Sequence, residues 1–191
     1  MNRTGRMMRT ASTAFQTRDD DGKLSIEGYF AVFNSDYQID TGLSESIAEG
    51  AFDNTISDDI RALINHDTTL VLGRTKAGTL QLRTDTHGLW GHIDINPNDV
   101  DAMNLYTRVQ RGDVDQCSFG FDIVNEETDF REDGSIHWTI KEVKLYEVSA
   151  CTFPAYAETS IAARSQERAE LIKRKNDAWK EKQIKKLKGE S

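Results

Sequence analysis

The chain has 191 residues, 37% of them hydrophobic, which suffices for one domain with a real core and some appendages. Its net charge of −8 is uneven, because residues 1–18 carry four Arg and no acid, and residues 164–191 carry ten Lys or Arg against five Asp or Glu. The middle of the chain therefore carries −17, which argues against specific nucleic-acid binding there. We interpret the basic C-terminal residues as a solvated helix rather than a nucleic-acid site.

The two cysteines, Cys117 and Cys151, lie inside apolar runs rather than in a spaced framework, as is typical of buried thiols in a reducing compartment. Arg3, Arg6 and Arg9 have no apolar segment behind them, and nowhere do eighteen apolar residues run together. We therefore expect a cytosolic protein that neither crosses a membrane nor is exported.

The first part of the chain is predicted to form a hairpin, a loop and a helix. Residues 13–18 and 23–33 are predicted strands joined by a tight turn that Gly22 favours. Residues 34–44 have few periodic apolar side chains and are predicted to be a loop. Residues 45–57 are predicted to be a short helix, because their apolar residues follow a helical stripe: Ile47, Ala48, Ala51, Phe52 and Ile56.

Further antiparallel strands are predicted at residues 59–66, 70–72, 78–83 and 89–95. In the first of these, His66 has the same parity as three apolar residues: Ile60, Ala62 and Ile64. A histidine in such a row is more often a hydrogen-bonded core residue than a catalyst, and both interpretations stay open.

Ser118 lies in the next predicted strand, after a helix that runs from about residue 98 to 111 and stops at Gly112. Apolar residues alternate around it, which places Ser118 on the polar face of the strand: Cys117, Phe119, Phe121 and Ile123. Gly120 leaves room beside the hydroxyl for another backbone or an extended peptide. Residues 126–135 are predicted to be a loop.

Glu147 lies in a long predicted strand, residues 138–153, whose parity switches between Ile140 and Val143 and indicates a bulge. Beyond the switch Glu147 shares its parity with Val143, Leu145, Ser149 and Cys151. Burying an unpaired carboxylate costs several kcal/mol, so we expect Glu147 to have a partner. Residues 166–188 are predicted to be a charged helix with little apolar face.

Three side chains suit serine peptidase chemistry. A serine nucleophile such as Ser118 needs a base, which His66 can be, and an acceptor that holds the base, which Glu147 can be. Spacing alone does not establish such a set. A metal site at His87, His92 and Asp94 has no fixed ligand geometry, and His92 is predicted to face solvent. Cys117 is predicted to be buried, so we discount it as a nucleophile.

Several ordered blocks in residues 24–163 resemble the prohead proteases of HK97-type tailed phages. The blocks are Glu27-Gly-Tyr-Phe-Ala-Val-Phe33, Glu49-Gly-Ala-Phe52, Ala62-Leu-Ile-Asn-His-Asp67, Val71-Leu-Gly-Arg74, Arg111-Gly-Asp-Val114, Ser118-Phe-Gly-Phe121, Leu145-Tyr-Glu-Val-Ser149 and Thr152-Phe-Pro-Ala-Tyr156. That family resembles the herpesvirus assemblins, whose catalytic residues come in the order His, Ser, His. The resemblance implies an α+β fold, a mostly antiparallel β-barrel with flanking helices, like the herpesvirus proteases.

The resemblance also implies the site, with Ser118 as nucleophile, His66 as base and Glu147 where the assemblins have their second histidine. It implies no metal or cofactor. Assemblins take oxyanion donors from a loop with arginines after the third member, but here the first Arg after Glu147 is Arg164, outside the matched core. That role stays unassigned.

The function implied is that of a serine endopeptidase that cleaves the major capsid protein and its scaffolding segment inside the immature phage or prophage capsid in the host cytoplasm. Its own chain is a further candidate substrate. The alternative is a catalytically inactive capsid-assembly or scaffold-binding protein of the same fold. Homo-oligomer formation stays open, and we expect no membrane or specific nucleic-acid partner. The expected organisation is an N-terminal arm with the first hairpin (residues 1–23), a protease domain (24–163) and a charged helical tail (164–191).

Overall fold

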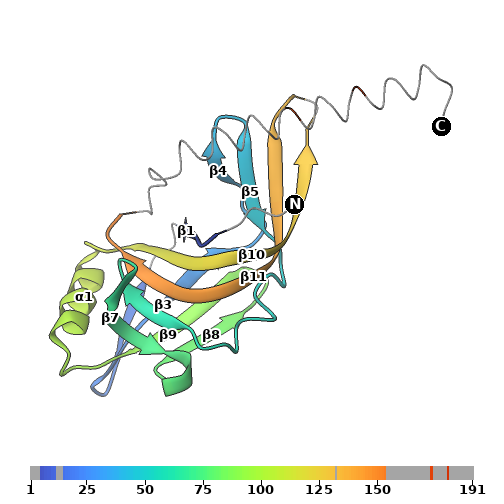
Figure 1. The fold of residues 1–191 in the computed structure, drawn as a ribbon. Coiled ribbons are helices and arrows are strands. Elements are labelled where there is room, and N and C mark those ends of the chain that lie inside the picture. Colours follow the sequence, from blue (N-terminus) through green and yellow to red (C-terminus); the bar gives the residue numbers. More distant parts are fainter. Residues whose placement is uncertain (1–4, 12–14, 132, 154–172, 174–179, 181–191) are drawn as a thin grey trace. The chain divides into compact units, whose positions relative to one another are not determined.

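The computed structural model describes residues 5–11, 15–131 and 133–153, and the single positions 173 and 180. Eleven strands, one α-helix and one short 3-10 helix follow one another along the described chain (Figure 1). They are β1 (Met7–Ala11), β2 (Gln16–Asp20), β3 (Lys23–Val32), β4 (Tyr37–Asp40), β5 (Leu43–Ile47), β6 (Arg61–Ile64), β7 (Asp67–Arg74), η1 (Thr75–Ala77), β8 (Leu80–Thr84), β9 (Gly88–Ile95), α1 (Val100–Arg111), β10 (Gln116–Phe130) and β11 (Ile136–Cys151).

The larger sheet has seven strands and is built on the long β10–β11 hairpin. Figure 1 shows these two strands side by side, curving across the molecule. β1 pairs with the outer side of β10, while the other side of β11 pairs in parallel first with β5 and then with β6. Beyond these strands, β4 pairs with β5, and β7 pairs with β6. β11 thus joins the pair β5–β4 and the pair β6–β7 in one sheet.

The smaller sheet is a four-stranded antiparallel sheet in the order β2-β3-β9-β8. Its apolar side chains share one core with those of the larger sheet; the fully buried members include Ile26, Phe30, Leu89, Ile93, Phe119, Phe121 and Leu145. Phe52 joins this core edge-on to Phe119, with ring centroids 5.6 Å apart. The core therefore lies on the side of β10 that carries Phe119 and Phe121.

The predicted fold class is wrong in its architecture. The strands form two separate sheets, neither closed into a barrel, and the larger sheet contains parallel pairings. Within the described ranges α1 is the one α-helix of several residues, so the fold is mostly β rather than α+β with flanking helices. Alternating apolar residues identify a strand but not its partners, and β11 is long enough to pair with two strands in succession.

Two local predictions are also wrong. The predicted helix at residues 45–57 is the end of β5 followed by turns, in which Ala51 and Phe52 are buried and Gly50 has a φ of +82°. Tight turns can bury residues at helical spacing without forming a helix, and this positive φ is one that glycine adopts readily. The predicted loops are partly strand, since β4 lies within residues 34–44 and β10 continues to Phe130.

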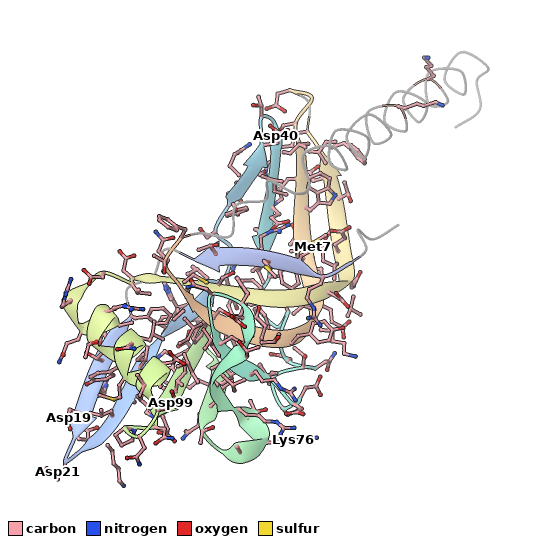
Figure 2. All side chains as sticks on the ribbon, turned by 60° about the vertical axis from the view of Figure 1, so that its left-hand side comes forward. Met7, Asp19, Asp21, Asp40, Lys76 and Asp99 are labelled. Atoms are coloured by element: carbon pink, nitrogen blue, oxygen red, sulfur yellow. The ribbon has the colours of Figure 1, made fainter. Side chains whose placement is uncertain are left out.

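Other elements confirm the predictions. β2 and β3 form the expected hairpin, with Asp19 and Asp21 at its tip, and β6 to β9 lie at the expected places (Figure 2). Helix α1 begins after Asp99, whose carboxylate accepts from the backbone N–H groups of Asp101 and Ala102 at 3.0 and 3.2 Å. It ends at Gly112, with a φ of +83°.

The predicted charged tail and the domain boundary at residue 163 lie outside the described residues. Of that tail the structure describes positions 173 and 180, both helical and exposed. Among the described residues, no helix combines the length and the hydropathy needed to cross a membrane. The predicted N-terminal arm includes β1, which belongs to the larger sheet.

Candidate active site

A bulge in β11 places Glu147 on the face of the sheet that carries Ser118. Leu145 pairs with Phe121, but Glu147 pairs with Gly120, so Tyr146 is the extra residue between them. The side chains of cross-strand partners share a face, which turns Glu147 away from the core face of Leu145. The predicted apolar row through Leu145 and Glu147 is therefore wrong.

A second bulge confirms the parity switch expected between Ile140 and Val143. Ile123 pairs with Val143 and Glu126 with Ile140, while the residues between them are irregularly paired. β11 thus changes face twice along its length. The alternation in the sequence predicts the change between Ile140 and Val143 but not the change next to Glu147.

His66 lies in a turn and not in the strand that its parity predicted. β6 ends at Ile64, which pairs with Asp67, and Asn65 and His66 are the two turn residues, with φ of +51° and +62°. Two positive φ values are typical of a type I′ hairpin turn, and Asn and His tolerate this region better than most residues. The turn aims the imidazole at the face that carries Glu147.

Asn65 attaches this turn to β11. Its backbone N–H donates to the carbonyl of Ala150 at 3.0 Å, and its side-chain oxygen accepts from the backbone N–H of Thr152 at 2.9 Å. Asp67 closes the other side of the turn by accepting from the N–H and hydroxyl of Thr69. The strained backbone of His66 is thus held on both sides.

The imidazole of His66 contacts the carboxylate of Glu147. His66 Nδ1 and Glu147 Oε1 are 2.7 Å apart, and both side chains are largely buried, with 14% and 8% exposed. The expectation that Glu147 has a partner is confirmed. A carboxylate can only accept at this contact, so the neutral ring carries its proton on Nδ1 and leaves Nε2 with a free lone pair.

Ser118 is fully buried, although the alternation in the sequence places it on the polar face of its strand. It lies directly opposite Ser149 in β11, and the hydroxyl of Ser149 in turn accepts from the backbone N–H of His66 at 3.3 Å. No hydrogen bond joins Ser118 Oγ to His66 Nε2 in this arrangement. In peptidases without substrate, the nucleophile and the base are often too far apart for a hydrogen bond, which forms when the substrate binds.

Three buried side-chain polar atoms of the described residues lack a hydrogen-bond partner: Ser118 Oγ, His66 Nε2 and Gln116 Oε1. Buried polar atoms are nearly always paired, and a catalytic role is one of the few reasons for exceptions. Two of the three atoms are those that proton transfer in a serine peptidase would join. Gln116 is two residues before Ser118 in the same strand.

The structure also describes the metal site and the thiol nucleophile that the sequence analysis discounts. His92 contacts Glu27 through Nδ1 and Asp94 through Nε2, both at 2.9 Å, so these groups lie on opposite sides of the ring and do not converge on one ion. The described chain contains no cluster of three His, Cys, Asp or Glu side chains that could hold a metal. Cys117 is fully buried and its thiol donates to the carbonyl of Tyr29 at 2.9 Å.

Sequence reasoning missed Ser149. It is fully buried and its hydroxyl donates to Glu147 Oε2 at 2.6 Å. The only signal was a polar residue two positions after Glu147 in an otherwise apolar run.

Comparison with known proteins identifies the family of the chain. The family model described as caudovirus prohead serine protease matches residues 12–174. The prohead protease of Enterobacteria phage HK97 is 32% identical over 148 residues, and the match covers 75% of this chain but 61% of the relative. The solved capsid assembly protease of bacteriophage T4 has a similar fold, with a TM-score of 0.55 at 13% identity, covering 80% of this chain and all of that one. The chain thus belongs to the caudovirus prohead serine protease family.

Proposed function

We propose that this protein is a serine endopeptidase in which Ser118 is the nucleophile, His66 the general base and Glu147 the group that orients and stabilises the imidazolium. The observation that carries the proposal is the 2.7 Å contact between His66 Nδ1 and Glu147 Oε1, which leaves Nε2 unpartnered near the strand that bears Ser118. Membership of the serine protease family supports the reaction class.

The reaction follows from these positions. Ser118 Oγ attacks the scissile carbonyl carbon while its proton passes to His66 Nε2. The imidazolium that forms is stabilised by the carboxylate of Glu147, and its Nε2 proton then goes to the leaving amine as the C–N bond breaks. A water molecule, deprotonated by the same nitrogen, hydrolyses the acyl-enzyme and restores Ser118. The low exposure of the pair makes its charge interaction stronger than it is in water.

The proposed substrate is the major capsid protein with its scaffolding segment, and the protein's own chain is a second candidate substrate. The support is the names of the relatives, a prohead protease and a capsid assembly protease. The place of action that follows is the interior of the prohead, in the host cell.

Co-expression with the capsid protein of the same phage, read by intact mass of both chains, tests the proposal. Wild type should shorten the capsid protein and Ser118→Ala should not, although the mutant stays folded because the lost hydroxyl has no partner. Ser46→Ala is the matched control, since Ser46 is also a buried serine, and its hydroxyl bonds to His137 at 2.9 Å and to no member of the proposed triad. Cleavage by Ser118→Ala at the wild-type rate would assign the nucleophile elsewhere. An intact capsid protein with the wild type would favour the inactive assembly protein.

A further inference from the structure

Ser149 occupies the centre of the candidate site without being a member of the proposed triad. It lies in β11, opposite Ser118 on one side and beside Leu63 of β6 on the other. Its side chain is fully buried on the face that carries Ser118 and Glu147. A small hydroxyl at this position is therefore enclosed by the groups proposed to react.

The hydroxyl of Ser149 contacts both parts of the acid–base pair. It donates to Glu147 Oε2 at 2.6 Å and accepts from the backbone N–H of His66 at 3.3 Å. The second bond uses the backbone of a residue in a strained, left-handed conformation. One oxygen atom thus connects the acid to the turn that presents the base.

The bond to Oε2 fixes the orientation of the carboxylate. Rotation about the last side-chain torsion of a glutamate is soft, so one hydrogen bond at Oε1 does not define the plane of the group. With Oε1 at His66 Nδ1 and Oε2 at Ser149, both oxygens have a donor and the plane is set. The hydrogen bond from Ser149 therefore helps to hold Oε1 at His66 Nδ1, where the imidazolium forms during the reaction.

We propose that Ser149 is a positioning residue for proteolysis, which holds the carboxylate of Glu147 in the orientation that contacts His66 Nδ1. The inference rests on the proposed function of Ser118, His66 and Glu147, and goes beyond it by assigning the group that orients the acid. Hydrogen bonds to the ligands of metal sites typically cost about 10- to 100-fold in activity when they are removed, and we expect a loss of the same order for the bond from Ser149.

The test compares kcat and KM of purified Ser149→Ala and Ser149→Thr on a peptide that spans the site at which wild type cuts the capsid protein. Ser149→Ala should lower kcat per folded molecule by about 10- to 100-fold with KM little changed, because the lost bond acts through the acid and not on bound peptide. Ser149→Thr keeps the hydroxyl and should recover most of the loss. Ser46→Ala, which removes a buried hydroxyl from the bond to His137, should leave kcat unchanged.

A role confined to stability gives a different result. In that case Ser149→Ala lowers the melting temperature while the folded fraction keeps a kcat within about twofold of wild type, and this result would overturn the proposal. If Ser149→Ala does not fold, Ser149→Cys, which nearly keeps the volume but has a weak donor, should show the same loss of kcat. Ser118→Ala is measured in parallel. Activity in that mutant refutes the proposed function, whereas an inactive Ser118→Ala with a normal Ser149→Ala refutes the role of Ser149 alone.

Discussion

Gly120 and Glu147 face each other across β10 and β11, and the carboxylate of Glu147 fills the space that a side chain at position 120 would occupy. A Cβ built on Gly120 would lie 3.1 Å from Cδ and 3.2 Å from Cγ of Glu147, and would overlap Oε1. The sequence suggested that this glycine admits a peptide beside Ser118. In the structure it admits the acid that contacts His66.

Gly120→Ala should therefore act on the site. The added methyl should move the Glu147 carboxylate away from His66 Nδ1 and lower the cleavage rate per folded molecule by about 10- to 100-fold, since small misplacements of catalytic groups have costs of this size. Overpacking should cost about 1–3 kcal/mol of stability. Gly91→Ala is the control, because its Cβ would meet Phe30 Cδ2 at 2.9 Å in the core. It should destabilise the fold without lowering the rate of folded molecules, and equal rate losses in both variants would contradict the prediction.

Glu147→Gln should remove the charge opposite the imidazolium with little change in shape. The amide can also turn its NH₂ toward His66 Nδ1 and favour the wrong tautomer, so we expect a loss of about 10²- to 10⁴-fold in cleavage rate. Thermal unfolding should change little in comparison. A near-normal rate per folded molecule would exclude Glu147 from the triad and would mean that another group supports His66.

Much of the fold is predictable from local patterns. Alternation located the β2–β3 hairpin and β6 to β9, and the residues around α1 predicted its position, because these signals depend on neighbours in the sequence. The pairing of β11 with β5 and β6 depends on residues about 80 to 100 positions away, and no period in the sequence encodes it. The prediction of a closed barrel is wrong for this reason.

The resemblance predicts the residues of the candidate site, whereas parity does not. Parity placed Ser118 on one face and Glu147 on the other, because it could not detect the extra residue at Tyr146. It placed His66 in a strand, because two residues with positive φ look like any other pair in a sequence. Both features turn side chains toward a common face. Functional sites are where local rules are expected to break.

The tail, residues 164–191, lacks in its sequence the apolar stripe with which a helix docks on a core. Deleting it should leave the melting temperature nearly unchanged but lower incorporation of the protein into proheads, measured by quantitative blotting of purified particles. A large fall in melting temperature would show that the domain extends beyond residue 163.

The two cysteines should be unreactive in the folded protein. Burial, the charge of Glu147 and the neighbouring Cys117 raise the pKa of the Cys151 thiol to about 12. Since the thiolate is the reactive form, an aromatic disulfide reagent at about pH 8 should titrate neither thiol in the native state and both after denaturation. Rapid reaction of a single thiol in the native protein would contradict the burial of Cys117 and Cys151.

His92 should make stability depend on pH. Burial lowers its pKa, but the hydrogen bonds to Asp94 and Glu27, and their charges, raise it by more, so the net pKa lies above its ordinary value. The protonated ring lies between these two carboxylates at 2.9 Å from each, and Glu27 also contacts Arg18.

The sign of the effect follows from linkage. A histidine with a raised folded pKa binds its proton more tightly in the native state, so its contribution is complete below the unfolded pKa of about 6.5 and disappears as pH rises through the folded value. Melting temperatures of wild type and His92→Gln should therefore differ most below about pH 6.5 and converge at higher pH. Asp94→Asn should weaken this difference without reversing it. A gap between wild type and His92→Gln that widens with rising pH would mean that His92 is stabilised as the neutral ring.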